Sequence, residues 1–222
     1  MTSIEAIKNR HSVRAYKEMP IPADLRQQIE TCINQCNQEG KLHLQLICDE
    51  PKAFNSTMAR YGKFVGVANY IACIGSGKHL DERIGYYGEK IVLLAQELGL
   101  NTCWVGMTFR KQPHIMHIDK GEKLVCVISI GYGKSQGAGH KIKTFDEVTK
   151  NAQDAPQWFK NGVEMALLAP TAINQQKFTF KLLPDNRVKA KSGMGFFAKV
   201  DVGIAKLHFE LGAGKENFSW EE

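Results

Sequence analysis

The stretch LVCVISI, residues 124–130, is an almost unbroken apolar run near the middle of the chain. A run without polar alternation is typical of a strand that is buried on both faces at the centre of a sheet. Four glycines within residues 131–139 then predict a loop. Upstream, the apolar run of residues 67–74 predicts a second buried strand. Between the two runs, residues 81–98 carry apolar side chains at helical spacing and end before Gly99, so they predict an amphipathic helix.

The chain before residue 67 predicts one more helix and one more strand. Apolar residues recur every three or four positions after Pro22, and Gly40 ends this helical pattern. Leucines at positions 42, 44 and 46 alternate with polar residues, which indicates a strand. Residues 49–66 contain one proline and two glycines and are expected to form a loop.

The pattern begins again after residue 150. A helix is expected after Pro156, a strand over residues 178–182, and a helix from about residue 201 to 213. Three residues of the earlier helix, Gly85, Leu93 and Ala95, match Gly203, Leu211 and Ala213, each 118 positions later. Three matches between amphipathic helices also arise by chance, so this indicates an internal duplication without establishing one. We divide the chain into a first half, residues 1–150, and a shorter second half, residues 151–222, packed as one unit.

Composition excludes several classes of protein. The 222 residues are 43% hydrophobic and 23% charged, which is ordinary for a folded globular chain and unlike a disordered one. Basic residues outnumber acidic ones by 29 to 23, but they are scattered, so nucleic acid is not an expected partner. No apolar run is long enough to span a membrane, and the N-terminal residues lack the apolar core of a signal peptide. We therefore expect a cytoplasmic protein without a membrane partner.

The cysteines and histidines do not predict a metal site. Six cysteines are present without a Cys-x-x-Cys pair, and most lie in apolar surroundings. We interpret them as reduced and mostly buried. The pair His114 and His117 has no suitable carboxylate or cysteine nearby in the sequence, so it is assigned to a loop. The segment GMGFFA, residues 193–198, matches a dinucleotide fingerprint in form only, because too few residues follow it for a βαβ unit.

Three segments have the chemistry to bind an anionic, flat ligand. In RHSVR, an extended backbone would direct Arg10, Ser12 and Arg14 to one side, which suits a phosphate. In ALLAPTAINQQKF, residues 166–178, small residues allow close approach to the backbone, and hydroxyl and amide groups suit the edge of a heteroaromatic ring. In LAQELGLNTCWVGM, residues 94–107, Gly106 could present its N–H group to a ligand. Taken singly, each segment fits a plainer reading: a solvated basic terminus, a helix end with turn residues, and a helix-turn-strand passage.

Together the three segments resemble the FMN-dependent nitroreductase family. RHSVR is similar to that family's R-x-S-x-R element, LGLNTCWVG to its L-G-L-x-T-C-W-x-G segment, and APTAINQQ to its A-P-[ST]-x-x-N-x-Q element. In ordinary members the last element follows the first helix, where this chain has QCNQEG at residues 35–40. Its place in the second half is similar to a minority branch in which two shortened halves of one chain imitate the family's dimer. The resemblance implies an α+β fold, an antiparallel-rich sheet flanked by helices.

The resemblance also implies a flavin site whose residues come from both halves of the chain. The expected FMN-binding residues are Arg10, His11, Ser12, Arg14, Trp104, Val105, Gly106, Lys141, Lys143, Pro170, Thr171, Ala172 and Asn174. Arg14 would stabilise the reduced flavin, Gly106 would hydrogen-bond its N5 atom, and the two lysines would meet its phosphate. One site per chain is expected, either in a monomer that imitates a dimer or in a homodimer.

The expected activity is reduction of nitroaromatic compounds, quinones or similar small electron acceptors by NADH or NADPH, in ping-pong order. Hydride transfer through a flavin needs no acid or base from the protein, so no catalytic residue is assigned. The alternative is a flavin-binding protein of the same fold with storage, sensing or other flavin chemistry. A flavin-free structural protein is a third possibility, against which the intact RHSVR and APTAIN segments argue. The sequence leaves open a redox role for Cys103.

Overall fold

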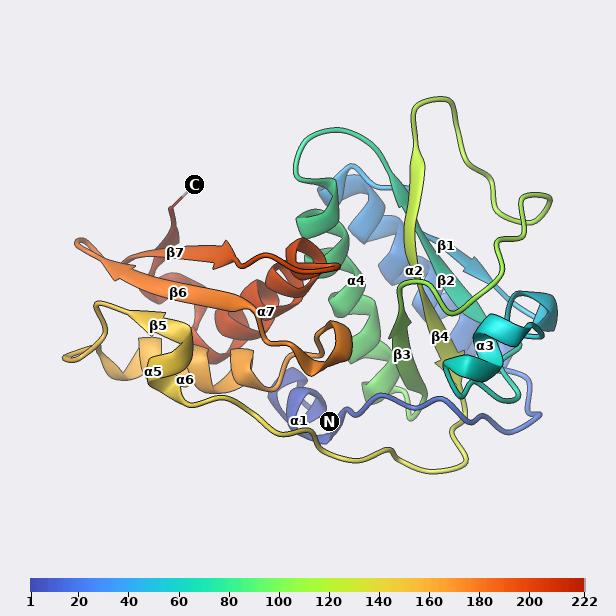
Figure 1. The fold of residues 1–222 in the computed structure, drawn as a ribbon, viewed down its shortest axis with the longest axis horizontal. Helices are drawn as coiled ribbons and strands as arrows, with labels where there is room; N and C mark the ends of the chain where they lie inside the picture. The colour runs from blue at the N-terminus through green and yellow to red at the C-terminus, as the bar shows by residue number, and fades with distance from the viewer. Residues whose placement is uncertain (222) are drawn as a thin grey trace. The chain divides into compact units, whose positions relative to one another are not determined.

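The chain divides into two compact units, each with its own four-stranded sheet (Figure 1). In the computed structural model, which describes residues 1–221, the first unit comprises Asn9–Leu80 and Lys90–Gly139. The second unit comprises Met1–Lys8, Asp81–Glu89 and the chain from His140 onward. Two helices, α1 (Ser3–Asn9) and α4 (Leu80–Glu97), contribute residues to both units.

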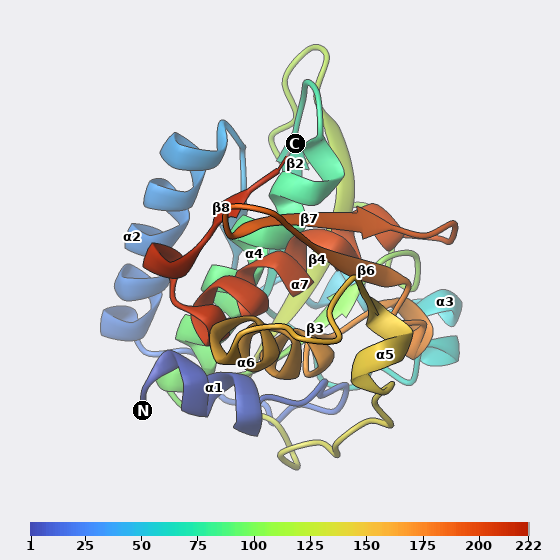
Figure 2. The same ribbon diagram turned by 90° about the vertical axis from the view of Figure 1, so that its left-hand side faces the viewer.

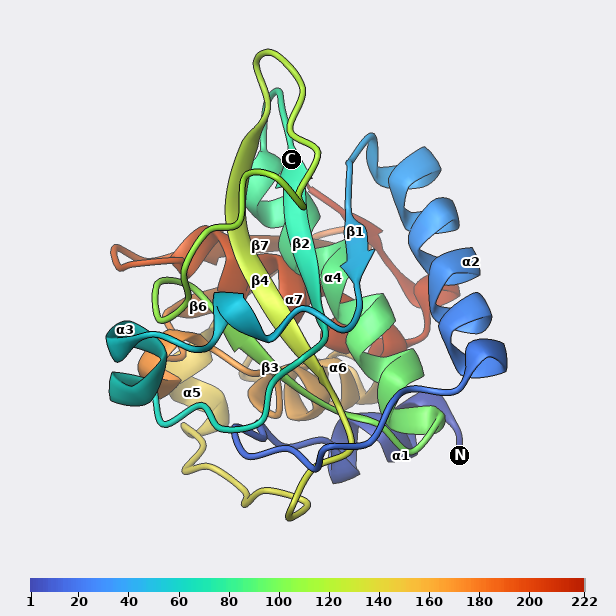
Figure 3. The same cartoon turned by 90° about the vertical axis from the view of Figure 1, so that its right-hand side faces the viewer.

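The first unit is built on an antiparallel sheet with the order β1-β2-β4-β3. Its strands are β1 (Gln45–Ile47), β2 (Tyr70–Gly75), β3 (Asn101–Val105) and β4 (Lys123–Gly131), and its helices are α2 (Ala23–Gly40) and α3 (Thr57–Tyr61). Helix α2 packs beside β1, and β2 and β4 occupy the middle of the sheet (Figure 3). The buried central strand predicted at residues 124–130 is therefore confirmed.

Burial explains why β2 and β4 lie in the middle. All six residues of β2 and the last six of β4 are buried, so neither strand has a solvent-facing side. A core of aromatic and aliphatic side chains, including Tyr16, Phe54, Phe64 and Tyr70, packs against them. Burial of this kind contributes about 25 cal/mol for each Å² of apolar surface removed from water. Both strands therefore read as apolar runs in the sequence.

Three predictions for the first unit need correction. The strand expected from residue 42 begins only at Gln45, because Leu42 makes an isolated bridge with Gly75 before the regular ladder starts. The strand expected from residue 67 begins at Tyr70. The expected loop at residues 49–66 contains two short helices, a 3₁₀ turn at Pro51–Ala53 and α3. The Glu50 and Ser56 side chains accept hydrogen bonds from their first backbone N–H groups, which is the usual role of an N-cap.

The second unit has the sheet order β5-β6-β7-β8, with an antiparallel central pair and parallel outer pairs. Its strands are β5 (Thr149–Lys150), β6 (Phe178–Leu183), β7 (Arg187–Ser192) and β8 (Ser219–Trp220). Its remaining helices are α5 (Phe145–Val148), α6 (Gln157–Leu167) and α7 (Ala198–Ala213), with 3₁₀ turns at Ala172–Asn174 and Lys215–Asn217. Helix α7 lies against β6 and β7, and α6 packs on α7 (Figure 2).

An aromatic cluster forms the core of the second unit. The rings of Phe180 and Phe209 are stacked with their centroids 4.7 Å apart, and Phe159 meets Phe209 edge-on at 5.4 Å. Trp220 of β8 also contacts Phe209, at 5.5 Å. These contacts join α6, α7 and the sheet, since one side chain comes from each of these elements.

The two units share an order of elements. Helix, strand, strand and helix follow one another as α2-β1-β2-α4 and again as α6-β6-β7-α7, and in both sets the two strands pair antiparallel. The residues before α4 and α7, His79 and Phe197, both have left-handed backbones, with φ of 53° and 58°. They lie 118 positions apart, the spacing already noted between the helices.

Among residues 1–221, no helix combines the length and apolar character needed to cross a membrane.

Candidate functional site

The basic segment of residues 10–14 lies along the start of β3 in the first unit. The Val13 N–H donates to the Thr102 carbonyl at 3.0 Å, and Ser12 forms a parallel bridge with Thr102. Three residues after Val13, the Tyr16 N–H donates to the Val65 carbonyl at 2.9 Å. These backbone bonds hold the segment extended, as the alternation of its residues predicts.

Arg10, Ser12 and Arg14 act together on one atom, the sulfur of Cys103. Burial raises the pKa of the Cys103 thiol. The charges of Arg14 and Arg10 lower it, as does a hydrogen bond with Ser12, but the net shift is upward. Two positive charges and one hydroxyl of this segment thus act on the Cys103 thiol.

The Cys103 thiol stays protonated at neutral pH, because its pKa lies above the ordinary value. A thiolate is the form of cysteine that attacks or is oxidised. The environment of Cys103 thus favours packing over redox chemistry.

The glycine loop of residues 131–139 covers the other side of this segment. A Cβ atom on Gly137 would lie 2.7 Å from Cβ of His11, and Gly137 has a φ of 76°, so no other residue fits there without movement. The Gly133 N–H donates to Oδ1 of Asn101 at 2.9 Å, which fixes the loop to the start of β3. The loop sets the position of His11 and leaves little room for the backbone to shift.

Strand β3 positions the remaining predicted residues of the first unit. Val105 is buried and pairs with Val127, whereas Trp104 is half-buried opposite Ile128. The ladder ends at Val105, and Gly106 is the next residue of the chain. The structure therefore brings residues 10–14 and 101–106 together within one unit.

Of the predicted residues of the second unit, Lys141 and Lys143 precede α5, and the other four lie in a strained loop between α6 and β6. Ile173, Asn174 and Gln176 have φ values of 48°, 56° and 44°, a region that residues other than glycine rarely adopt. Three such residues in four positions store conformational strain of about 1–3 kcal/mol each, and strain of this kind concentrates at functional sites. Ile173 is almost fully exposed at the tip of the loop.

Gln176 is the centre of the hydrogen bonds that maintain this loop, and it was missing from the predicted site. Its Nε2 donates to the Lys141 carbonyl at 2.8 Å, and its Oε1 accepts from the Lys143 N–H at 2.9 Å. Its own N–H donates to Oγ1 of Thr171 at 3.1 Å. The side chain is buried, with 3% exposed. The only sequence signal for Gln176 is that it occupies the last position of the APTAINQQ element, residues 169–176.

Asn174 and Lys143 have partners inside the loop. Nδ2 of Asn174 donates to the Lys141 carbonyl at 2.9 Å, and its Oδ1 accepts from Gln176 at 3.0 Å. The Lys143 ammonium donates to the Gln176 carbonyl at 3.0 Å. The structure therefore gives both residues a role in shaping the loop, in addition to the ligand contacts predicted for them.

Asp201, in the first turn of α7, is a second residue that the sequence did not single out. Its Oδ1 accepts from the Ala172 N–H at 3.0 Å, and its Oδ2 accepts from Nε2 of Gln175 at 2.7 Å. Burial raises the pKa of Asp201 to about 6, although these two hydrogen bonds lower it. A buried carboxyl group thus holds the backbone of the loop next to Thr171.

Two exposed apolar side chains lie on a segment joined to the strained loop. Gln175 donates to the Phe196 carbonyl at 2.8 Å, and Lys177 donates to the Met194 carbonyl at 2.9 Å. The side chains of Met194 and Phe196 are 93% and 80% exposed. Exposed apolar groups beside a strained loop are suited to contact a flat ligand.

A cavity of about 690 Å³ lies elsewhere in the first unit. It is lined by residues 16–20, 60 and 64–69 together with parts of residues 49–55 and 130–131. This volume is in the range of small-molecule sites, but none of the predicted flavin-binding residues lines it. The basic cluster of residues 10–14 is therefore separate from this cavity.

Comparison with known families and structures gives one family and a set of similar folds. A sequence model of the family described as "Putative TM nitroreductase" matches residues 2–213. No curated protein sequence matches the chain. The crystal structure of a putative nitroreductase from Thermotoga maritima is similar with a TM-score of 0.69 and 26% identity. That match covers 97% of this chain and 85% of the other.

Two further structures share the fold at lower identity. One is a putative NADH dehydrogenase/NAD(P)H nitroreductase from Parabacteroides distasonis, with a TM-score of 0.52, 18% identity, and coverage of 67% of this chain and 97% of that one. The other is a putative nitroreductase in complex with FMN from Desulfovibrio desulfuricans, with a TM-score of 0.52, 16% identity, and coverage of 66% and 94%. The expected fold, helices around antiparallel-rich sheets as in nitroreductases, is confirmed.

Proposed function

Because the chain belongs to the family described as "Putative TM nitroreductase", we propose that it is an FMN-dependent oxidoreductase that uses NADH or NADPH. Its acceptors would be nitroaromatic compounds, quinones or similar small molecules. The observation that carries the proposal is the gathering of Arg10, Ser12 and Arg14 around Cys103. The FMN complex of the Desulfovibrio protein, which shares the fold, supports the choice of cofactor.

The basic cluster fits the phosphate of FMN. Two guanidinium groups and a hydroxyl offer several donors within one small region, and arginine binds phosphate oxygens with two parallel hydrogen bonds. Gly137 leaves no space for a side chain beside His11, so the glycine loop fixes the backbone that carries the donors. Arg14 is exposed and can reach a ligand without first losing a buried position.

The strained loop of residues 171–176 fits a flat ring. Thr171 and Ala172 are both small. Thr171 has an extended backbone and its hydroxyl accepts from the Gln176 N–H, whereas Ala172 begins a 3₁₀ turn and its N–H donates to Asp201. We assign to this loop, with Pro170 and Asn174, the contacts to the flavin ring, and to Lys141 a contact to the phosphate. We also assign Lys143 a contact to the phosphate. To make it, the Lys143 ammonium would have to share or give up its hydrogen bond to the Gln176 carbonyl.

When bound, FMN supplies two-electron chemistry, taking a hydride from the nicotinamide donor and passing electrons to the acceptor in turn. The protein's own residues orient the cofactor and adjust its charge. Arg14 would place a positive charge where the reduced cofactor is negative, which favours reduction. Trp104 and Val105 would hold the backbone of Gly106 so that its N–H group points to the cofactor. No side chain is required to donate or accept a proton in hydride transfer.

The first test is the visible absorption spectrum of the purified protein, with and without NADH or NADPH. We expect the spectrum of an oxidised flavin, bleached by one of the two donors and restored by a quinone. A flavin that neither donor bleaches would favour a binding or storage protein instead. A protein that remains colourless after incubation with FMN would overturn the proposal.

We further infer that the two sets of helix-strand-strand-helix elements arose by internal duplication and that one chain takes the place of a dimer. The shared order, and the left-handed residues His79 and Phe197 at the same spacing as the helices, support this inference. The boundary between the halves at residue 150 stays a prediction. Light scattering coupled to size exclusion should give the mass of one chain, and a tight homodimer would contradict the inference.

The six cysteines are all free, which fits the proposed cytoplasmic location.

A further inference from the structure

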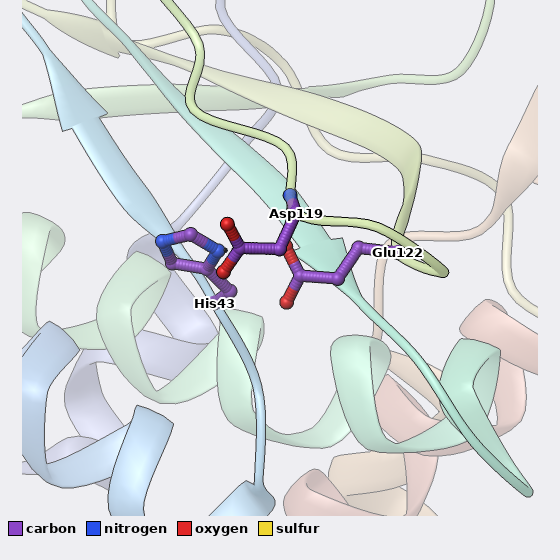
Figure 4. Close-up of side chains that lie close together, drawn as sticks. All are labelled: His43, Asp119 and Glu122. Carbon is purple, nitrogen blue, oxygen red and sulfur yellow. Dashed lines mark hydrogen bonds and ion pairs between the residues drawn. The ribbon is translucent and has the colours of Figure 1, made fainter.

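Four side chains with metal-binding chemistry gather at one end of the first unit's sheet. Figure 4 shows His43, Asp119 and Glu122, whose nearest ligand atoms all lie within 4.8 Å of one another. Nδ1 of His43 is 2.8 Å from Oε2 of Glu122. Beside them, Nε2 of His117 is 3.0 Å from Oδ1 of Asp119, and the two imidazole rings meet edge-on at 5.9 Å. His117 lies in a loop, as the sequence predicted, but the expectation that it lacks a suitable carboxylate neighbour is wrong, because Asp119 lies beside it.

Gln45 joins His43 to the backbone of His117. The Gln45 Oε1 accepts the His117 N–H at 2.9 Å, so the other end of its amide is the NH₂ group. That group donates to the His117 carbonyl and lies 3.1 Å from Nε2 of His43. Nδ1 of His43 is directed at Glu122. Gln45 therefore fixes the orientation of the His43 ring, and the ring nitrogen that faces Glu122 is the one available to a metal ion.

Glu122 connects His43 to Asp119 through one carboxylate oxygen. Its Oε2 accepts from the Asp119 N–H at 2.9 Å and lies 2.8 Å from Nδ1 of His43, so one carboxylate oxygen already joins two members of the cluster. Its side chain is 15% exposed and that of His43 is 30% exposed, so both can be reached from solvent. Asp119 and His117 are largely exposed and pair with each other at 3.0 Å.

We propose that His43, Asp119 and Glu122, with His117 as a fourth ligand, bind a divalent transition-metal ion, for which Zn²⁺ is the best fit. Two imidazoles and two carboxylates suit zinc and its neighbours, whereas calcium and magnesium prefer oxygen ligands alone. Zinc bonds of about 2.0–2.2 Å place ligand atoms roughly 3.4 Å apart, so the ligand atoms of His43, Asp119 and Glu122, now within 4.8 Å of one another, would move closer together on binding, and His117 would join them through Asp119. The ion would replace the proton on Nδ1 of His43, and that proton would leave to solvent.

The ion would crosslink two separate parts of the first unit. His43 lies just before β1, and the other three ligands lie in the connection of residues 106–122 between β3 and β4. A connection of this length without regular structure is uncommon and often functional. Its only described side-chain bonds to the β1 segment run through His43 and Gln45. The expected role is therefore to order this connection.

The test is titration of untagged protein with ZnCl₂ in a calorimeter. We expect one ion per chain in the wild type, and at least tenfold weaker binding in His43→Gln and in Glu122→Gln. Glu122→Gln keeps the shape of the side chain, so it covers the case in which His43→Gln folds poorly. His114→Gln is the matched control, since His114 lies in the same connection but outside the cluster. Equal affinity in wild type and both variants, or no binding by the wild type, would overturn the proposal.

Two further readouts separate this site from other metal ligands. Co²⁺ bound here should lack the near-ultraviolet band of a cobalt-thiolate bond, which excludes the pair Cys32 and Cys36 as the ligands. Zn²⁺ should also slow cleavage by trypsin at the exposed residues Lys111 and Lys120 in the wild type. In His43→Gln the ion should give no protection. A thiolate band, or equal protection of both proteins, would contradict the assignment.

Discussion

Gly85 of α4 and Gly203 of α7 contact each other's helices in a reciprocal way. A Cβ atom on Gly85 would lie 2.0 Å from the Val200 carbonyl oxygen, and one on Gly203 would lie 2.0 Å from the Glu82 carbonyl oxygen. Both pairs of equivalent residues, Gly85 with Gly203 and Glu82 with Val200, are 118 positions apart. Reciprocal contacts of this kind are the mark of a two-fold interface, found here within one chain.

Replacing either glycine with alanine should destabilise the protein strongly. The neighbouring atoms are backbone atoms, so the helices must separate to admit a methyl group, at a cost of about 1–3 kcal/mol or more. We expect lower midpoints of urea unfolding for Gly85→Ala and Gly203→Ala. Gly193→Ala is the control, because its Cβ would meet only Lys177 at 3.4 Å. Midpoints equal to that of the control would show that the helices tolerate the added group.

Removal of the basic cluster should release FMN. Hydrogen bonds to charged groups contribute about 1.5–3 kcal/mol each, so Arg10→Ala with Arg14→Ala should weaken FMN binding by about 100-fold or more. Fluorescence titration of the apoprotein with FMN measures this. Arg14→Ala alone should show a smaller loss without affecting folding, because Arg14 is exposed. Arg110→Ala, also on an exposed residue of the first unit, should bind FMN normally, and full retention by the double variant would remove the phosphate assignment.

Loss of the Gln176 side chain should disorder the strained loop. Gln176→Ala removes the bonds to the Lys141 carbonyl and the Lys143 N–H and leaves both groups without these partners. We expect a loss of about 2–3 kcal/mol in unfolding free energy. FMN affinity should fall as well if residues 171–174 contact the ring. Gln153→Ala, at an exposed position, should change neither quantity.

Asp201 should make stability depend on pH. Its pKa of about 6 in the folded protein lies above the ordinary value of about 4. Between these values the folded state keeps a proton that the unfolded state has lost, so stability decreases as pH rises from about 4 to 6 and is level above that. The decrease is on the order of 3 kcal/mol. Asp201→Asn lacks this titrating group, so its stability relative to that of the wild type should increase as pH rises from about 4 to 6.

Urea unfolding of the two proteins at pH 4, 5, 6 and 7 measures this difference. The asparagine side chain keeps an oxygen to accept the Ala172 N–H, but its NH₂ group cannot accept from Gln175, and the loss of that bond is the same at every pH in this range. A difference in stability that stays constant from pH 4 to 7 would mean that Asp201 titrates normally.

The sequence predicted the elements whose burial is uniform or periodic. The run at residues 124–130 became β4, and helical spacing located α2, α4, α6 and α7 to within a few residues. It missed α1, β5 and β8, because two-residue strands and a seven-residue helix are too short to show a period. It also missed β7, RVKAKS, whose lysines and half-buried side chains conceal the alternation.

The candidate site followed the same division. Segments whose chemistry is local, such as residues 10–14, were found from their residue types. Gln176 and Asp201 were not, because their importance depends on partners more than 20 residues away in the chain. The cluster around His43 joins residues 79 positions apart, and no local pattern reports such a contact.

The composition of the second unit has a consequence for synthesis on the ribosome. Its residues come from the beginning, the middle and the last third of the chain, so it cannot be completed until α7 has emerged. The first unit needs nothing beyond Gly139 and can fold earlier. Until then the face of α4 around Gly85 has no partner and is open to chaperones or to another nascent chain. Gly85 of α4 and Gly203 of α7 occupy equivalent positions in their helices. For this reason, α4 of a second chain is the partner that the exposed face would accept most readily. Pairs of chains stalled before α7 are thus the expected misfolded product of this gene's translation.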